Sequence, residues 1–169
     1  MKKHPLFYSI AVNLIITSSL YCQVQKTERS GEPDIYNFSG NDKEMNKAIK
    51  TARQTIKEFN QAILSGNKNY RAFTLKVRFP TPKGFEHIWL SGISFKENKY
   101  SGIVDDVPEA IPNMKMGDTV KIRSEDITDR IYLDQKKLRG GYTIRVIRKR
   151  MIESERKKFD AENNFIIGD

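Results

Sequence analysis

The chain has 169 residues, of which 38% are hydrophobic, and its 30 lysine and arginine residues against 21 aspartate and glutamate residues give a formal charge of +9. This length allows one domain with tails. Plentiful apolar residues, ordinary glycine and proline contents and a single cysteine exclude a collagen-like protein, a disulfide scaffold and a fully disordered chain. The basic charge favours anionic partners, although charge bears on association rather than on fold.

Residues 1–22 have the pattern of an export signal, with two lysines after the first methionine and an apolar run over residues 6–20. The run is shorter than the roughly 20 apolar residues of a membrane span, so an uncleaved anchor is the weaker alternative. Cys22 offers a site for lipidation, but Tyr21 is bulky for a lipoprotein signal. We therefore predict an exported protein, periplasmic or secreted, and favour soluble export over a lipid anchor.

Cysteine and histidine are too scarce for a zinc site. No cysteine follows Cys22, and His87 is the only histidine beyond the export signal. Zinc sites usually draw on several of these residues. Asp105, Asp106 and Glu109 do not have the spacing of a calcium-binding EF-hand loop. We expect no disulfide, no metal and no cofactor.

The first helix is predicted to follow a polar linker. Residues 23–41 contain turn-prone residues and show no period, which predicts a flexible linker. Asn41 or Asp42 can cap the next segment, and Gly66 can end it in the left-handed conformation. Between them, apolar residues recur at the spacing of one helical face: Met45, Ile49, Ala52, Ile56, Phe59 and Ile63. The sequence therefore predicts one amphipathic helix over 42–63.

Five strands are expected next. Strict alternation over 73–79 predicts the first, and apolar runs over 86–95 and 100–104 predict two more, joined by a four-residue loop at 96–99. A bulge is predicted at Ser91 and Gly92, where the alternation shifts. The remaining two strands are predicted at 119–123 and 130–134, with turn residues at 135–137.

A second helix is predicted from Thr143, as its cap, to Lys158. Gly140 and Gly141 precede it and favour a tight turn with positive φ. The expected fold is an α+β domain over 42–158, followed by an acidic tail over 159–169. In it the amphipathic N-terminal helix and the basic C-terminal helix pack on a small, twisted, mainly antiparallel sheet, with barrel-like closure as an alternative.

Several short motifs resemble a known family. They are Glu44-Met45-Asn46, Ala48-Ile49, Ala52-Arg53, Glu86-His87-Ile88-Trp89, Ser101-Gly102, Gly117-Asp118, Ile127-Thr128-Asp129 and Gly140-Gly141-Tyr142-Thr143-Ile144-Arg145. Together they are similar to the small bacterial YegJ-like proteins, the domain of unknown function 2314 family. The resemblance implies export and carries no assigned activity, so no catalytic residues are transferred. The family pattern has tryptophan after the aspartate where this chain has Arg130, which implies an altered pocket.

His87 is the main candidate for proton transfer. Adjacent residues of a strand point to opposite faces, so Glu86 cannot easily assist it. Ser91, His87 and Asp129 could form a nucleophilic arrangement, but no G-x-S-x-G elbow surrounds the serine. We favour a structural role for His87, hydrogen-bonded beside Trp89.

Asp129 has two interpretations. The favoured one is turn capping, in which the carboxylate accepts backbone N–H bonds. The alternative pairs Asp129 with Arg145 or Arg130 at a pocket edge. The candidate binding residues are Glu86, Trp89, Asp129, Tyr142 and Arg145.

The most distinctive electrostatic feature is residues 136–158, with ten lysine or arginine residues and two glutamates. The favoured interpretation is a solvated helix, partly neutralised by pairs such as Glu153 with Lys157. The alternative is contact with an anionic membrane surface or an acidic envelope protein through Arg148, Lys149 and Arg150. Nucleic acid is not expected after export.

These features predict a noncatalytic interaction or binding module of the cell envelope. The alternative is a small envelope hydrolase that uses His87 and Asp129.

Overall fold

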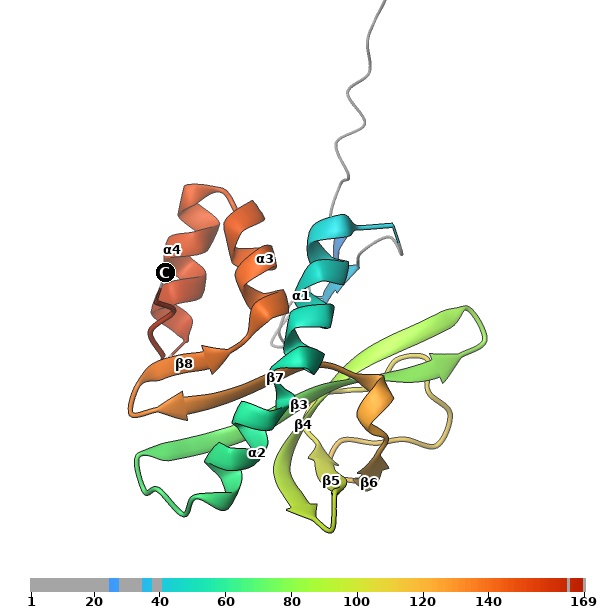
Figure 1. The fold of residues 1–169 in the computed structure, drawn as a ribbon. Helices are drawn as coiled ribbons and strands as arrows, with labels where there is room; N and C mark the ends of the chain where they lie inside the picture. The colour runs from blue at the N-terminus through green and yellow to red at the C-terminus, as the bar shows by residue number, and fades with distance from the viewer. Residues whose placement is uncertain (1–24, 28–34, 38–40, 164, 169) are drawn as a thin grey trace, which may run out of the picture.

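The computed structural model describes residues 25–27, 35–37, 41–163 and 165–168. The predicted export signal and Cys22 lie outside these residues. The described residues form four helices and an open six-stranded antiparallel sheet of order β6-β5-β4-β3-β7-β8, which is not closed into a barrel (Figure 1). The first three helices contact the sheet, and the fourth lies against the third. The strands are β3 (Tyr70–Thr81), β4 (Gly84–Lys96), β5 (Lys99–Val104), β6 (Thr119–Ile122), β7 (Ile127–Asp134) and β8 (Lys137–Gly140). The predicted α+β class is confirmed.

The core lies between the sheet and the second helix. Alternate residues of β3 and β4 are buried opposite one another, Leu75 against Leu90 and Val77 against Ile88. Phe59, which is fully buried, joins them from the helical layer. The period-two pattern of the sequence thus places one face of each strand in the core.

Two strand details differ from the prediction. Lys96 pairs with Lys99, so the hairpin loop has two residues, Glu97 and Asn98, both with positive φ, rather than four. The strand β8 was not predicted, because it has four residues and only Leu138 is buried. The predicted bulge after Ser91 is confirmed by a register shift between β4 and β5.

A second, two-stranded sheet lies within the segment predicted as a linker. Strand β1 (Gln25–Thr27) pairs antiparallel with β2 (Ile35–Asn37). Each strand has only three residues, which is too few for an alternation to be recognised in the sequence.

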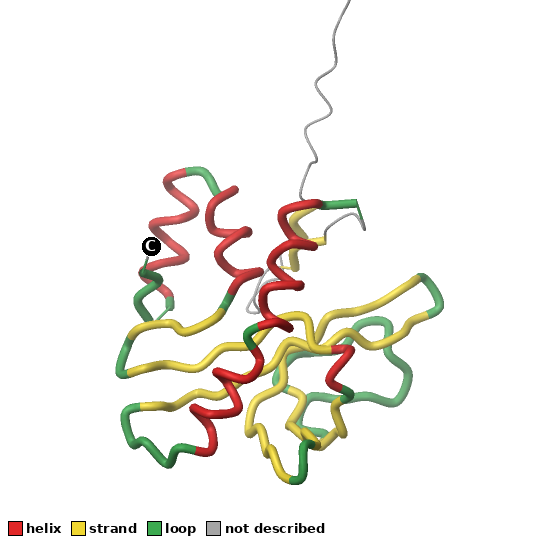
Figure 2. The backbone as a smooth tube through the Cα atoms, in the orientation of Figure 1, coloured by secondary structure: helices red, strands yellow, loops and turns green. Residues whose placement is uncertain are grey.

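The predicted single helix over 42–63 is two helices, α1 (Lys43–Gln54) and α2 (Ile56–Leu64). They are joined at Thr55, whose hydroxyl donates to the carbonyl oxygen of Thr51 at 2.8 Å. Back-bonding of this kind bends helices. Figure 2 shows the short non-helical join where the two helices cross the strands.

The predicted second helix is also two helices, α3 (Tyr142–Arg150) and α4 (Glu153–Glu162). Met151 and Ile152 between them are extended, with ψ of 143° and 161°, and Met151 is buried. The chain reverses there, so α4 runs beside α3 (Figure 1). The single-helix prediction was wrong because burial of Met151 outweighs continuation of the helix. A 3₁₀ turn, η1 (Ser124–Asp126), precedes β7.

None of the helices in the described part of the chain has the length and apolar character needed to cross a membrane.

Candidate functional site

The carboxylate of Asp129 caps the N-terminus of α3 from strand β7. It is fully buried and accepts hydrogen bonds from the backbone N–H groups of Tyr142 at 3.1 Å and Thr143 at 2.8 Å. It also accepts from the Thr143 hydroxyl at 2.6 Å and from the backbone N–H of Arg130 at 2.8 Å. Burial raises the pKa of Asp129, and the hydrogen bonds from Thr143 oppose that rise. The favoured interpretation, acceptance of backbone N–H bonds, matches this geometry.

The start of α3 differs from the predicted cap. The helix begins at Tyr142 after Gly141, so Thr143 is inside the first turn, and its hydroxyl donates to Asp129 instead of capping. Gly140 and Gly141 both have positive φ, as expected. A Cβ on Gly140 would lie 2.0 Å from the carbonyl oxygen of Arg130, so only glycine fits there. The anion at this helix N-terminus is therefore the protein's own carboxylate.

His87 is hydrogen-bonded to Thr128, with 3.0 Å between Nδ1 and the hydroxyl oxygen. That hydroxyl also donates to the carbonyl oxygen of Lys76 at 3.2 Å. Desolvation of the ring, followed by the charges of Lys76, Arg78 and Arg53, lowers the pKa of His87 to about 4, although the residue keeps exposed surface. The imidazole is thus neutral near neutral pH.

The predicted nucleophilic arrangement is not assembled. Within residues 41–163, no hydrogen bond joins His87 to Asp129 or to Ser91. Ser91 pairs with Ile103 on β5, four residues along β4 from the histidine. Asp129 accepts its hydrogen bonds mainly from α3, and His87 is hydrogen-bonded to Thr128.

Glu86 and Trp89, both on β4, contact other parts of the protein. The two carboxylate oxygens of Glu86 accept from the backbone N–H groups of Glu109 at 2.7 Å and Ala110 at 2.8 Å, which fixes the loop after β5. Trp89 is half-buried, and the Nζ atom of Lys76 lies 5.3 Å from its ring centroid. Burial lowers the pKa of Lys76, opposed by Asp129 and Asp106.

A polar pocket of about 380 Å³ lies on the other side of β7. In the pairing of β3 with β7, Asp129 lies opposite Lys76 and Arg130 lies opposite Leu75. The side chains of these two neighbours on β7 therefore point to opposite faces of the sheet. Tyr142 and Arg145, two of the predicted binding residues, line this pocket. The full lining is Glu58, Tyr70, Arg130, Tyr132, Asp134, Leu138, Arg139, Gly140, Tyr142 and Arg145.

Arg130 is the central charge of the pocket. Its side chain is 1% exposed, and its Nη2 atom donates to Glu58 on α2 at 2.6 Å and to the Tyr142 hydroxyl at 3.3 Å. Its Nε atom is buried and has no hydrogen-bond partner among the described residues. A buried N–H group without a partner is uncommon in proteins.

The other charges of the pocket are held in different ways. Arg139 forms an ion pair with Asp134 at 2.6 Å. Arg145 donates to the backbone carbonyl oxygens of Gly140 at 3.1 Å, Leu138 at 3.3 Å and Gly168. These contacts satisfy hydrogen bonds of Arg145, and among the described residues none of its contacts is a carboxylate.

The predicted anionic-surface residues are engaged in ion pairs within the chain. Arg148 donates through two nitrogens to Asp160 on α4, both at 2.7 Å. Lys149 contacts Glu44 at 2.8 Å, and Arg150 contacts Asp42 at 2.5 Å, linking α3 to the start of α1. The hydrogen bond from Arg150 lowers the pKa of Asp42 to about 2. Lys157 pairs with Glu153 at 2.7 Å, as the helical spacing predicts.

Of the pocket residues, the sequence predicted only Tyr142 and Arg145 as binding residues, and those that it missed include Glu58, Tyr70 and Tyr132. Tyr132 alternates with Arg130 along β7, and this spacing could have placed both on one side of the strand. Glu58 lies next to the buried Phe59 on α2, and nothing in the local sequence indicates that its carboxylate contacts β7.

Residues 42–165 match the family described as "Uncharacterized protein conserved in bacteria (DUF2314)". The chain is 30% identical to "Uncharacterized protein YegJ" of Escherichia coli (strain K12) over 145 residues, which cover 85% of this chain and 86% of that protein. It is 27% identical to "Putative ankyrin repeat protein NMB1133/NMB1171" of Neisseria meningitidis serogroup B over 147 residues, 82% of this chain and 58% of that protein. No solved structure matches the chain significantly. The chain therefore belongs to the DUF2314 family of uncharacterised bacterial proteins.

Proposed function

We propose that the chain is a noncatalytic binding module exported to the cell envelope, and that the pocket around Arg130 is its binding site. The observation that carries the binding role is a polar pocket of about 380 Å³ built around a buried arginine. That volume is in the range of small-molecule sites, in which a few fixed polar groups orient the ligand.

The absence of catalysis is supported by how the candidate chemical groups are used. Asp129 accepts four hydrogen bonds from α3 and its own strand, and none of them comes from His87. A general base must reach the proton that it removes, and a triad needs its acid and base in contact. The pocket lining does not include His87, Asp129 or Ser91.

Export is supported by the sequence of residues 1–22, with its lysines, apolar run and lack of acidic residues. To test export, the full-length chain with a C-terminal tag is expressed in a bacterium. The mass of the tagged chain in the envelope and cytoplasmic fractions is then measured by mass spectrometry. We expect a shortened chain in the envelope fraction. A Leu14→Arg variant, which interrupts the apolar run, should stay in the cytoplasm at full length.

The binding role is tested against the hydrolase alternative with 4-nitrophenyl acetate and 4-nitrophenyl phosphate. We expect the same background hydrolysis from the protein and from a His87→Gln variant. Turnover by the protein that falls about 100-fold or more in the variant would establish catalysis and overturn the proposal.

A further inference from the structure

The guanidinium of Arg130 has unused hydrogen-bonding capacity. Arginine presents five N–H donors in a planar fork that matches the two oxygens of a carboxylate or phosphate group. Glu58 uses this fork through one oxygen, at 2.6 Å, and the buried Nε atom has no partner in the described part of the chain. The site is therefore built for an oxyanion and is only half used by the one that it contacts.

Glu58 is suited to give way to a ligand. Its side chain is 62% exposed while that of Arg130 is 1% exposed, so the glutamate can rotate into solvent. A ligand oxyanion that takes its place keeps the buried guanidinium paired, which avoids the cost of an unpaired buried charge. The hydroxyl of Tyr142, 3.3 Å from Nη2, remains beside the guanidinium as a second polar contact.

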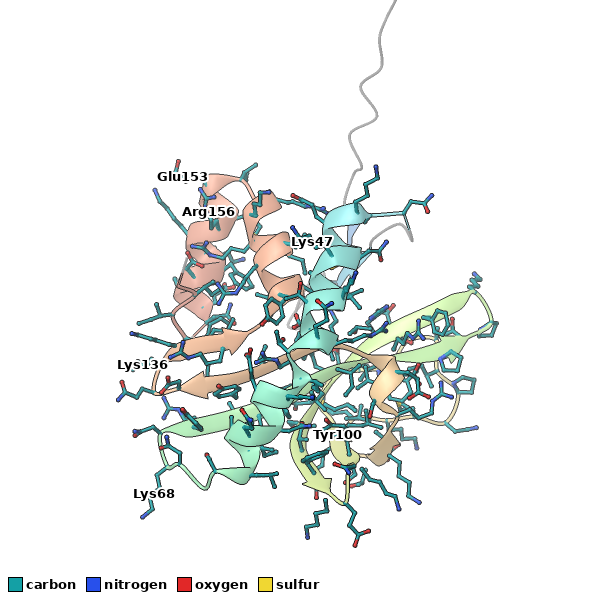
Figure 3. All side chains as sticks on the ribbon, in the orientation of Figure 1. Lys47, Lys68, Tyr100, Lys136, Glu153 and Arg156 are labelled. Atoms are coloured by element: carbon teal, nitrogen blue, oxygen red, sulfur yellow. The ribbon has the colours of Figure 1, made fainter. Side chains whose placement is uncertain are left out.

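The surroundings of the pocket favour an anion. Arg145 adds a charge that no carboxylate neutralises within its described contacts, whereas Asp134 is already paired with Arg139. Two exposed lysines, Lys68 and Lys136, extend from the loops that adjoin the pocket residues Tyr70 and Asp134, which pair across β3 and β7 (Figure 3). Positive charge around a pocket raises the local concentration of anions.

We propose that this pocket binds a small solute through a carboxylate or phosphate group, which takes the place of Glu58 on Arg130. The inference rests on the proposed binding role and names its ligand class. The rings of Tyr70 and Tyr132, 5.2 Å apart, form part of the wall and can contact the remainder of such a solute.

The test is calorimetric titration of the protein, purified in the form that bacteria produce, with inorganic phosphate and separately with benzoate. We expect saturable binding of at least one probe at one site per chain. Phosphate binding alone assigns a phosphate ligand, and benzoate binding alone assigns an aromatic carboxylate. Failure of both probes to bind would overturn the ligand class.

Three variants locate the binding. Arg130→Met should weaken it by at least about tenfold, because a charge-assisted pair is lost. Glu58→Gln should strengthen it by about threefold or more, because the internal competitor loses its charge. Glu125→Gln, an exposed carboxylate outside the pocket, is the matched control and should leave affinity unchanged.

If Glu58→Gln binds the probe with unchanged affinity, the proposal that the ligand displaces Glu58 from Arg130 is overturned. This result decides the point even if Arg130→Met does not fold. Failure of the proposed ligand class is distinguishable from failure of the proposed function. An envelope protein without His87-dependent turnover that binds neither probe keeps the proposed function and loses only the ligand class. A protein that binds phosphate but hydrolyses a nitrophenyl ester through His87 loses the noncatalytic role.

Discussion

Asp129 and Arg130 are neighbours on β7 and are both buried, yet the polar groups around them are satisfied to different degrees. The carboxylate of Asp129 accepts four hydrogen bonds, three of them from the first turn of α3. The guanidinium of Arg130 has one ion pair, with an exposed glutamate, and a buried Nε atom without a partner among the described residues.

The difference separates a structural site from the binding site that we propose. A buried polar network that is fully satisfied fixes the structure around it and has no capacity for a ligand. A buried donor without a partner costs folding free energy, and proteins accept such costs where function needs the group. On this argument the Asp129 side of β7 joins sheet to helix, and the Arg130 side is the one that we propose to bind a ligand.

The largest expected effect comes from removing the carboxylate of Asp129. In Asp129→Ala, the buried N–H groups of Tyr142 and Thr143 lose their acceptor, and each unsatisfied donor costs about 1–3 kcal/mol. We expect the free energy of unfolding in urea to fall by about 3 kcal/mol or more. Thr143→Ser, which keeps the hydroxyl, is the control and should lose less than about 1 kcal/mol. A small loss in Asp129→Ala would show that the Asp129 side is not a structural site.

Much of the fold could be predicted from the sequence, because long strands and helices carry enough apolar residues for their period to be recognised. Strand β3 and helix α1 are of this kind. The breaks at Thr55 and Met151 could not be predicted, since both depend on tertiary contacts. The hydroxyl of Thr55, for example, is also within hydrogen-bond distance, 3.1 Å, of the hydroxyl of Tyr142, 87 residues away in sequence.

The site could be predicted only in part. The motif residues Tyr142 and Arg145 do line the pocket, and the capping role favoured for Asp129 has the expected donors. The ion pair between Arg130 and Glu58 spans 72 residues, and no local pattern indicates it. Which carboxylate meets which arginine is decided by how α2 lies against β7.

A second test concerns Thr128, which precedes Asp129 on β7 and is hydrogen-bonded to His87. Thr128→Val keeps the shape of the buried side chain and removes the hydroxyl that contacts His87 and the carbonyl oxygen of Lys76. We expect thermal or urea unfolding to show a loss of about 1–2 kcal/mol. Thr128→Ser restores a hydroxyl and should recover part of this loss. A stability equal to that of the unchanged chain would mean that these hydrogen bonds contribute nothing net.

Arg130→Met, unlike Asp129→Ala, is expected not to lower the free energy of unfolding. Methionine fills similar space without an unsatisfied donor, and Glu58, being exposed, can be solvated when its partner is removed. We expect the free energy of unfolding to stay equal or to rise by about 1 kcal/mol, measured in urea beside Asp129→Ala. A loss as large as that of Asp129→Ala would remove the distinction between the two sides of β7.

The smallest expected effect is the pH dependence from His87. Its pKa is about 4 in the folded chain, lowered by desolvation and by Lys76, Arg78 and Arg53, against the ordinary value of 6.5. The unfolded chain therefore binds more protons than the folded chain between these values, and stability falls as pH falls from about 6.5 to 4. Below pH 4 both states are protonated and this contribution stops changing.

The measurement is the difference in unfolding free energy between the unchanged chain and His87→Gln at several pH values from 7 to 4. We expect the difference to change in favour of the variant as the pH falls, because glutamine does not titrate. The change should be modest, since the ring keeps exposed surface that solvent can screen. A constant difference over this range would mean that the pKa of His87 is not lowered by folding.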